Sequence, residues 1–247
     1  MIHGKKIVCV IPARLKSTRF KEKVLKSLGG KPILLHVLEN AKACNCFDDI
    51  VFAIDHEKTK ALIDSFGGKW FMTDESCPSG TMRLCEYRIQ SKVKADFWLN
   101  WQADEPLIPK EMIQDLLLSV DFLSDVYTLK KKISNEEATK ATIVKVVTNK
   151  QDQALYFSRA MIPFIREEKE NLTPYYKHIG LYLYADEALE QISNFNLTNL
   201  EQTEKLEQLT FLYHGMKIKA VETTYEGIGI DLEEDLARAE NLLKALS

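Results

Sequence analysis

The sequence lacks a long hydrophobic run and any regular pairing of its cysteines. The five cysteines are odd in number and show no paired C-x-x-C spacing, which argues against a disulfide framework and a structural zinc site. No stretch approaches the roughly 20 apolar residues that a membrane-spanning helix needs. The apolar run at 7–11 is too short for a signal peptide, and no small-residue cleavage site follows it. These absences predict a cytoplasmic protein without membrane insertion.

An excess of positive charge is also missing. The formal net charge is -3, so nucleic acid and anionic membranes are poor candidate partners, and local arginines and lysines must bind any anionic substrate. The chain has no Ser/Gly-rich linker between independently folding domains. Its 247 residues suffice for one α/β domain, or for a main domain with a small second lobe.

The first half of the chain alternates strand and helix patterns. Strands are expected at 6–11, 50–54, 69–72 and 96–101, and helices at 32–43, 58–66, 83–91 and from 110 onward. Apolar strands separated by helices predict a parallel sheet covered on both faces. Ligands of such sheets bind at the carboxyl ends of the strands, so the loops after the first and fourth strands are the candidate site.

The second half has a different pattern. Strands are expected at 142–147, 180–184 and 217–221, and helices at 186–192, 202–213 and 233–246. A turn-rich segment containing Pro163 and Pro174 separates the first two of these strands. We expect a small lobe at about 150–215 and then a return to the main sheet, so that 1–247 forms a single domain carrying one lobe.

The loop after the first strand gathers positive charge. It carries five cations and two hydroxyls: Arg14, Lys16, Ser17, Thr18, Arg19, Lys21 and Lys23. Such groups can bind a triphosphate, because they all donate hydrogen bonds to phosphate oxygens. The same composition is equally typical of a solvated connecting loop. The loop matches neither the Walker A pattern nor G-x-G-x-x-G, which disfavours a P-loop kinase and a Rossmann dehydrogenase.

Further motifs follow this loop along nearly the whole chain. The loop itself reads I-P-A-R-x-x-S-T-R-F, with K-x-L and G-G-K-P-I after it, all within 11–33. The later blocks are G-G-K-W-F-M-T-D (67–74), S-G-T-M-R-L (79–84), N-W-Q-A-D-E-P-L-I-P (100–109), V-K-V-V (144–147), A-L-Y-F-S-R-A-M-I-P (154–163), K-H-I-G-L-Y-L-Y (177–184), E-K-L-E-Q-L (204–209) and I-D-L-E-E-D-L-A-R-A (230–239). In content and order these blocks resemble the 3-deoxy-manno-octulosonate (KDO) cytidylyltransferases, also called CMP-KDO synthetases.

The resemblance implies a fold, a reaction and a cofactor. The fold is a Rossmann-like nucleotidyltransferase fold of the α/β class, with a central, mostly parallel sheet and a small α+β lobe. The reaction transfers CMP from CTP to the acidic sugar KDO with release of pyrophosphate, for lipopolysaccharide biosynthesis, and it uses Mg²⁺. The family is generally dimeric through its smaller lobe, so the resemblance implies a homodimer whose lobe also binds the sugar.

The resemblance also implies roles for individual residues. The residues implied in catalysis are Arg14, Lys23, Asp104 and Asp231, the two aspartates holding Mg²⁺. The residues implied in nucleotide binding are Ala13, Arg14, Ser17, Lys23, Arg83 and Gln102. The residues implied in binding the sugar acid are Arg159, His178, Tyr182, Glu207 and Gln208.

Position alone allows simpler roles for several of these residues. Asp104 follows the fourth expected strand, where a carboxylate can hold Mg²⁺ against phosphates; the next helix begins only after Pro109, so a capping role is awkward. Asp231 precedes the last helix, where an N-cap is the more frequent role. His178 alone is more typical of a structural histidine than of a ligand-binding one.

The chain departs from the family pattern at several positions. The substituted residues are Lys21 for a proline, Cys77 for a frequent histidine, Met82 for the acid of G-T-[DE]-R, Ala103 for the glycine of Q-G-D-E-P, and Ala185 and Thr210 for frequent arginines. Ala103 is compatible only with a negative φ. The two missing arginines weaken binding of the sugar carboxylate or indicate a different acidic sugar.

Three functions therefore stay open at the level of sequence. The first is KDO cytidylyltransferase, and the second is the same chemistry on 8-amino-KDO or a nonulosonic acid such as sialic acid. The third is a degenerate nucleotide-binding protein without turnover. The H-I-G-x-Y and L-E-Q-L motifs favour a KDO-type acceptor. Retention of Asp104 and Asp231 argues against the degenerate binder, because simple binding needs no pair of metal carboxylates.

Overall fold

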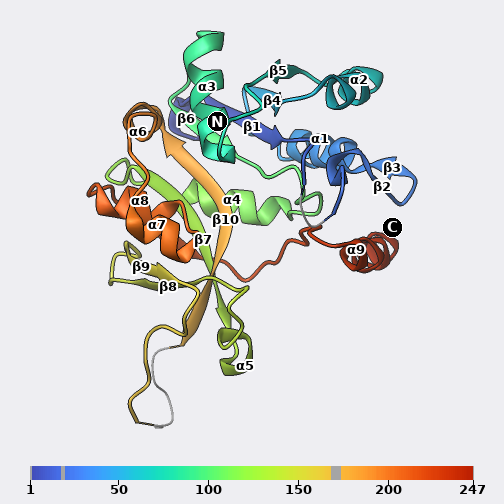
Figure 1. Ribbon diagram of the computed structural model, residues 1–247. Helices are drawn as coiled ribbons and strands as arrows, with labels where there is room; N and C mark the ends of the chain where they lie inside the picture. The colour runs from blue at the N-terminus through green and yellow to red at the C-terminus, as the bar shows by residue number, and fades with distance from the viewer. Residues whose placement is uncertain (1, 18–19, 168–173, 247) are drawn as a thin grey trace. The chain divides into compact units, whose positions relative to one another are not determined.

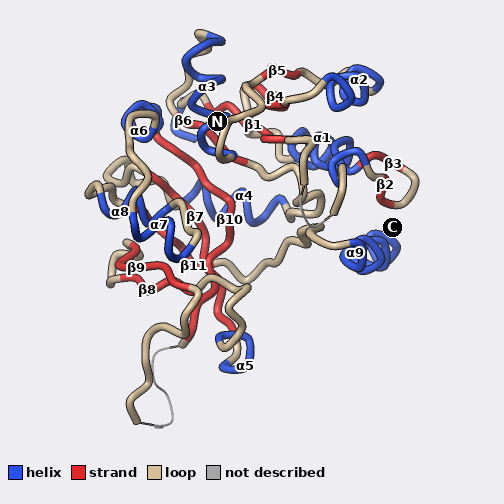
Figure 2. Tube along the Cα trace, in the orientation of Figure 1, coloured by secondary structure: helices blue, strands red, loops and turns tan. Residues whose placement is uncertain are grey.

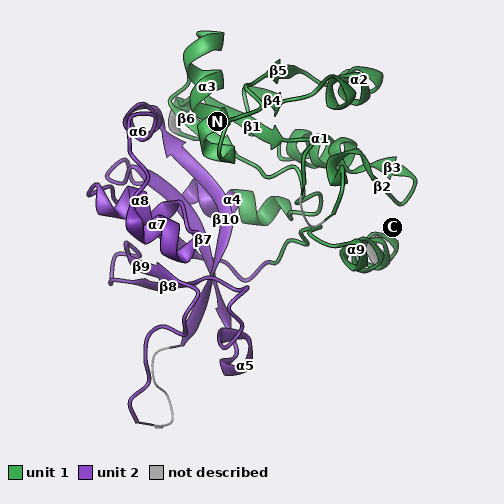
Figure 3. Cartoon of the chain, viewed as in Figure 1, with its two compact units in different colours: residues 1–113, 226–247 green, residues 114–225 purple. Residues whose placement is uncertain are grey.

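The structure is a computed structural model that describes residues 2–17, 20–167 and 174–246 (Figure 1). The chain forms two compact units (Figure 3): unit 1 is residues 1–113 with 226–247, and unit 2 is residues 114–225. The lobe predicted at about 150–215 lies within unit 2, which extends beyond it at both ends. In the described part of the chain, no helix is long and apolar enough to cross a membrane.

Unit 1 contains most of the N-terminal half and the C-terminal helix. Its elements are η1 (Ile2–Gly4), β1 (Ile7–Ala13), η2 (Lys23–Leu25), β2 (Ser27–Leu28), β3 (Lys31–Pro32), α1 (Ile33–Ala43), β4 (Asp49–Ile54), α2 (Glu57–Ser65), β5 (Trp70–Met72), α3 (Gly80–Ser91), β6 (Phe97–Asn100) and α9 (Glu233–Leu246). Helix α4 (Lys110–Leu118) contains the boundary between the units.

The sheet of unit 1 has the strand order β6-β1-β4-β5, and these strands are all parallel. Every residue of β1 is buried, as expected for a central strand covered on both faces. The predicted parallel sheet is therefore confirmed. Because neighbouring strands run in the same direction, the loops after β1, β4 and β6 leave the sheet at one edge.

Two predicted boundaries in unit 1 are wrong by a few residues. Helix α3 begins at Gly80 rather than at Arg83, because the Ser79 hydroxyl caps the helix by accepting a hydrogen bond from the Met82 amide. Strand β1 continues through Pro12 to Ala13 instead of ending at the proline. Its pairing with β6 stops at Val10, so the missing amide of Pro12 removes no hydrogen bond from that ladder.

Unit 2 contains both helices and strands. Its elements are β7 (Val126–Ile133), α5 (Asn135–Ala138), β8 (Lys145–Thr148), β9 (Ala154–Ser158), β10 (Tyr175–Ala185), α6 (Asp186–Ile192), α7 (Asn199–Glu204), α8 (Gln208–Tyr213) and β11 (Ile218–Glu222). Strand β7 pairs in parallel with β11 and in antiparallel with β10. Strand β8 pairs in antiparallel with β9 and β10.

The sequence patterns did not predict β7 and β9, and the strand that they predicted at 180–184 is shorter than β10. Strand β7 contains three consecutive lysines, which mask its apolar alternation. The first of them, Lys130, is buried because its ammonium group donates to Thr148 and Asp152 at 2.5 and 2.9 Å. Strand β8 also begins at Lys145 rather than at residue 142. A lysine that is buried with hydrogen-bond partners therefore interrupts the hydrophobic pattern from which a strand is predicted.

The single helix predicted at 202–213 is wrong, because two short helices, α7 and α8, occupy this region (Figure 2). The break lies at Lys205, which adopts the left-handed conformation with φ 54° and ψ 48°. A helix end leaves backbone carbonyls without partners inside the helix. The carbonyls of Glu204 and Lys205 become acceptors for Arg159 for this reason.

Candidate active site

A cavity in unit 1 brings together most of the residues predicted to bind the nucleotide. It measures about 350 Å³ and lies where the loops after β1 and β6 leave the sheet. The predicted residues that line it are Arg14, Ser17, Lys23, Arg83, Gln102, Asp104 and Asp231. Ala13 is the buried last residue of β1, directly before this loop. Thr18 and Arg19, which are among the seven cations and hydroxyls of the loop after the first strand, lie outside the described residues.

Two backbone contacts bring Asp104 and Asp231 together although they are far apart in sequence. The Ile230 amide donates to the Asp104 carbonyl at 2.8 Å, and Leu107 forms an isolated antiparallel bridge with Ile228. Leu107 and Ile230 also belong to one buried apolar cluster with residues of the loop after β1 and of α9. Burial of apolar area, worth about 25 cal/mol per Å², holds the C-terminal segment against the loop after β6.

The two aspartates share one ammonium group. The Lys23 Nζ donates to Asp104 Oδ2 at 2.6 Å and to Asp231 Oδ1 at 2.9 Å. Burial alone lowers the pKa of Lys23, but the two carboxylates outweigh it and the pKa is raised. Lys23 is therefore charged at neutral pH. Asp231 is directed to this lysine, whereas Asp235 accepts the hydrogen bonds of the Asp231 and Leu232 amides at the start of α9.

The carboxylate pair fits Mg²⁺ by the chemistry of its donors. Two carboxylates already converge on one cation, and Mg²⁺ is commonly bound by one or two carboxylates together with substrate phosphates. In the described residues, no group of three or more His, Cys, Asp or Glu side chains is placed to hold a metal ion. Asp104 and Asp231 are thus the residues that would hold the ion, with phosphate oxygens completing its shell.

The N-terminus of α3 forms another wall of the cavity. Ser79 and Gly80 line it, and the Gly80 Cα lies so close to the Gln102 side chain that an added Cβ would be 3.3 Å from its Nε2. A helix N-terminus attracts anions through its dipole and its unpaired amides. Because Met82 replaces an acidic residue, the first turn of α3 contains no acidic side chain to repel a phosphate. Gln102 donates to Asn100 at 3.0 Å.

The Arg83 side chain contacts other residues of the protein. Its guanidinium group pairs with Asp55 at 2.8 Å and donates to the Thr73 hydroxyl and to the Asp74 carbonyl. The side chains of Arg83 and Asp55 are only 3% and 5% exposed. A direct role of Arg83 in nucleotide binding stays a prediction. Sequence reasoning missed Asp55, although it directly follows β4 and so stands at a strand end.

Two of the departures from the family pattern lie in this cavity and are structurally mild. Ala103 is absent from the described residues with positive φ, so alanine replaces glycine there without backbone strain. Burial raises the pKa of the Cys77 thiol. A raised pKa disfavours the reactive thiolate, which supports the interpretation of Cys77 as an unreactive side chain.

Unit 2 brings together three of the five residues predicted to bind the sugar acid. The rings of His178 and Tyr182, both on β10, have centroids 5.3 Å apart. Burial raises the pKa of Tyr182 well above its usual value, and the negative charge of Glu207 raises it further. Gln208, next to Glu207, is the buried first residue of α8. The guanidinium group of Arg159 instead donates hydrogen bonds to α7 and to the segment before β8.

Arg159 is held from two sides. Its Nε donates to the Glu204 carbonyl at 2.8 Å, and its backbone amide donates to the Glu204 carboxylate at 2.9 Å. Its own carbonyl accepts a 2.6 Å hydrogen bond from the ammonium group of Lys145, which is fully buried. Sequence reasoning assigned no role to Glu204 or Lys145. Both stand in motifs quoted above, E-K-L-E-Q-L and V-K-V-V, but the motifs alone do not show that either residue contacts Arg159.

The environment of His178 predicts a pH-dependent stability. Packing near Phe157 and Tyr182 withdraws the ring from water, and this burial lowers the pKa of His178 from 6.5 to about 3. Between these values the unfolded chain binds a proton that the folded chain does not. The free energy of unfolding therefore decreases as pH falls below 6.5.

We expect His178→Gln to remove this dependence. Between pH 7 and pH 5 the wild type should lose about 2 kcal/mol more unfolding free energy than the variant does. Urea denaturation at the two pH values measures the difference. Equal losses in the two proteins would show that the ring titrates normally in the folded state.

Known proteins identify the class and then the family of this chain. A parallel α/β sheet with cations and carboxylates at its carboxyl edge is the arrangement of a nucleotide-binding enzyme. The sequence profile described as "Cytidylyltransferase" matches residues 8–218. The chain belongs to the cytidylyltransferase family, and it is an enzyme of the nucleotidyltransferase class.

Individual relatives are similar to this protein over nearly its whole chain. A 3-deoxy-manno-octulosonate cytidylyltransferase of Thermodesulfovibrio yellowstonii is 42% identical over 97% of this chain and 99% of the relative. A protein of the same name from Solibacter usitatus is 41% identical over 98% of this chain and 96% of the relative. The solved structure of a CMP:2-keto-3-deoxy-manno-octonic acid synthetase with CTP has a TM-score of 0.92 and 36% identity, covering 98% of this chain and 100% of that one. The resemblance stated from the motifs and the predicted fold class are confirmed.

Proposed function

We propose that this protein transfers CMP from CTP to KDO, giving CMP-KDO and pyrophosphate, with Mg²⁺ as the cofactor. The observation that carries the proposal is the meeting of Lys23, Asp104 and Asp231 in a cavity that Arg14 and Ser17 also line. A cytidylyltransferase needs such a combination, because a triphosphate requires cations and its metal ion requires carboxylates. The names of the full-length relatives support KDO as the acceptor.

The proposed reaction is a direct displacement. The anomeric hydroxyl of the sugar acid forms a new bond to the α-phosphorus of CTP, its proton is lost, and the bond to pyrophosphate breaks. Arg14 and Lys23 would bind the triphosphate and neutralise the charge that develops on it. Asp104 and Asp231 would hold Mg²⁺, which supplies further neutralisation of phosphate charge.

The residues of unit 2 would bind the acceptor. Arg159 would pair with the sugar carboxylate, because a guanidinium fork matches a carboxylate geometrically. His178 is neutral through its lowered pKa, so it would contribute hydrogen bonds rather than charge. Gln208 and Glu207 would bind sugar hydroxyls. By resemblance, the proposal also includes a homodimer and a place in lipopolysaccharide biosynthesis in the cytoplasm.

One observation favours a variant acidic sugar as the alternative acceptor. Thr210, which stands where the family frequently has an arginine, is 4% exposed, and its hydroxyl contacts Thr198 and Glu201. This position therefore offers no cation to a substrate carboxylate. An acceptor such as 8-amino-KDO, which carries its own positive charge, would need fewer cations from the protein.

The proposal is tested by pyrophosphate release with Mg²⁺ and CTP against KDO, 8-amino-KDO and sialic acid. We expect release with KDO at a rate well above that of the two other sugars. Release with 8-amino-KDO or sialic acid alone would keep the chemistry and replace the acceptor. Silence with all three sugars, in folded protein that binds CTP by calorimetry, would contradict the proposal and favour a binding protein without turnover.

A further inference from the structure

Asp55 occupies a position that the proposed reaction does not use. It follows β4 directly, at the edge of the sheet where the loop after β1 also begins. Its two carboxylate oxygens have different partners: Oδ1 accepts from the Leu15 amide at 2.8 Å, and Oδ2 pairs with Arg83 at 2.8 Å. Asp55 therefore connects the loop after β1 with helix α3.

The contacts of Arg83 extend this connection to a third strand end. Its other terminal nitrogen donates to the Thr73 hydroxyl and to the Asp74 carbonyl, directly after β5. The Thr73 hydroxyl and amide both donate to the Ile54 carbonyl, at 2.8 and 2.7 Å. The Arg83 and Asp55 side chains at the centre of this network are almost completely shielded from solvent, so each of these groups is held in one geometry.

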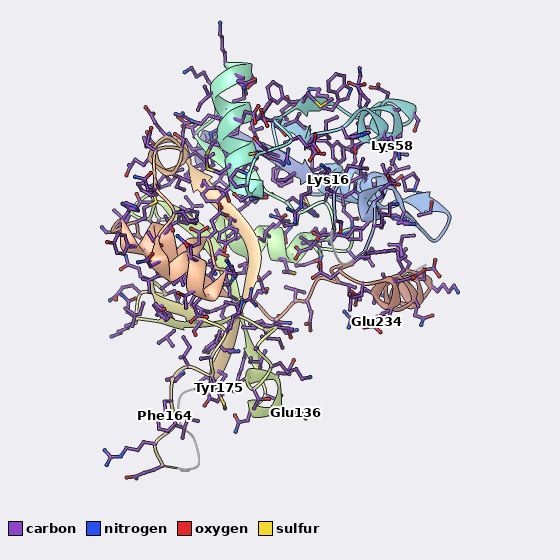
Figure 4. The ribbon with its side chains drawn as sticks, in the orientation of Figure 1. Lys16, Lys58, Glu136, Phe164, Tyr175 and Glu234 are labelled. Atoms are coloured by element: carbon purple, nitrogen blue, oxygen red, sulfur yellow. The ribbon has the colours of Figure 1, made fainter. Side chains whose placement is uncertain are left out.

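The first part of the loop, at Leu15, is fixed by this network. Arg14 and Ser17 line the 350 Å³ cavity and also a second hollow of about 500 Å³, so the loop borders open space on two sides. Lys23, further along the loop, is held separately by Asp104 and Asp231. Next to Leu15, Lys16, labelled in Figure 4, pairs with Glu75, and their side chains are 83% and 57% exposed. Exposed ion pairs contribute little to position, whereas a buried carboxylate bonded to a backbone amide fixes the chain.

We propose that Asp55 is a positioning residue for the phosphate-binding loop. It holds the Leu15 amide, while Arg83 holds Asp55, and Arg14 and Ser17 are thereby kept at the cavity. Asp55 itself need not touch the substrate. This inference rests on the proposed function only in naming the triphosphate of CTP as the anion, because the contacts that fix the loop are independent of the reaction.

The test compares Asp55→Ala with Asp48→Ala. Asp48 is a matched control, because its carboxylate accepts a 2.8 Å hydrogen bond from the Ile7 amide at the opposite end of β1, away from the cavity. Three quantities are measured on each full-length variant: the melting temperature, the dissociation constants for CTP and for tripolyphosphate, and the exchange rate of the Leu15 amide by NMR. KM for the sugar acid is measured as a further control.

We expect Asp55→Ala to weaken binding of CTP and tripolyphosphate about 10- to 100-fold, because small displacements of binding groups have effects of this size. The Leu15 amide should exchange at least about tenfold faster. KM for the sugar acid should be unchanged. Asp48→Ala should lower the melting temperature and leave both dissociation constants as in the wild type.

A double variant separates the backbone contact from the ion pair. Asn at 55 keeps an oxygen for the Leu15 amide, and Arg83→Gln removes the charge that would otherwise be left unpaired. Asp55→Asn with Arg83→Gln should restore slow exchange of the Leu15 amide. This readout does not depend on whether Arg83 also touches the nucleotide.

The outcomes separate the proposed role of Asp55 from the proposed function of the protein. If Asp55→Ala loses only thermal stability, as Asp48→Ala does, then Asp55 is structural and the inference is wrong. If the wild type binds tripolyphosphate but not CTP, the proposed function fails, and the effect of Asp55→Ala on tripolyphosphate binding still decides the inference. If the wild type binds neither anion, the loop is no phosphate-binding loop and both are wrong.

Discussion

Asp104→Asn is expected to abolish turnover while the fold stays intact. The amide keeps the size and shape of the side chain but removes the charge that would hold Mg²⁺ and that now holds Lys23 at 2.6 Å. We expect kcat to fall by roughly 10²–10³-fold or more, the size of effect seen when one electrostatic group is removed from an active site. Pyrophosphate release measures the loss.

The fold should tolerate this change for a specific reason. Asp104 is 29% exposed at its side chain, and Lys23 keeps Asp231 as a second partner in the variant. The expected loss of unfolding free energy is therefore about 1 kcal/mol or less. Circular dichroism should show an unchanged spectrum and a small shift of the melting temperature.

The neighbouring residue provides a matched control for this variant. Glu105 carries the same charge one residue further along the chain, and it is absent from the cavity lining. Glu105→Gln should retain a rate close to that of the wild type. Normal turnover in Asp104→Asn would contradict the assignment of the metal site, and equal losses in both variants would indicate a general effect of charge on this loop.

The sequence predicted the fold best where burial alone determines the hydrophobic pattern of a strand. The seven residues of β1 are all buried, so their apolar character follows from a single fact, the position of this strand inside a parallel sheet. Strand β7 was missed because Lys130 is buried through polar partners rather than excluded from the interior. The break at Lys205 was missed because a left-handed lysine has no local signal in the sequence.

The candidate site shows the same division. The loop after β1 and Asp104 were predictable, because strand ends in a parallel sheet collect the ligand-binding groups. Asp55 and Glu204 were not predicted, because their roles exist only through pairs formed at a distance: Asp55 with Arg83, 28 residues away, and Glu204 with Arg159, 45 residues away. Such pairs depend on tertiary structure, and no spacing along the chain reveals them.

Lys23→Met is expected to have opposite effects on the two ligands of the cavity. In the structure, the ammonium group lies between Asp104 and Asp231, where a divalent cation would bind. Methionine keeps most of the side-chain volume and removes the charge, so the two carboxylates lose their cation and should bind a divalent ion more tightly. We expect Mn²⁺ affinity without nucleotide to rise about tenfold, corresponding to about 1.4 kcal/mol at one cation site.

The same variant should lose most of its activity. In the proposed function the Lys23 charge binds the triphosphate, so CTP binding should weaken and pyrophosphate release should fall by roughly 10²-fold or more. Thermal stability gives an independent readout, because Mg²⁺ should raise the melting temperature of the variant more than that of the wild type. Lys26→Met is the control, since Lys26 is exposed and lies over the ring of Phe20 rather than in the cavity.

The direction of the change in Mn²⁺ affinity decides what the Lys23 contacts mean. Tighter binding in Lys23→Met would show that the lysine and the metal ion compete for one carboxylate pair. Lys23 would then have to leave the aspartates when the ion and CTP bind together, which would place its charge on the triphosphate. Weaker or unchanged binding would show that Asp104 and Asp231 are not the ligands of the ion, and that Lys23 joins them only to fix the C-terminal segment against the loop after β6.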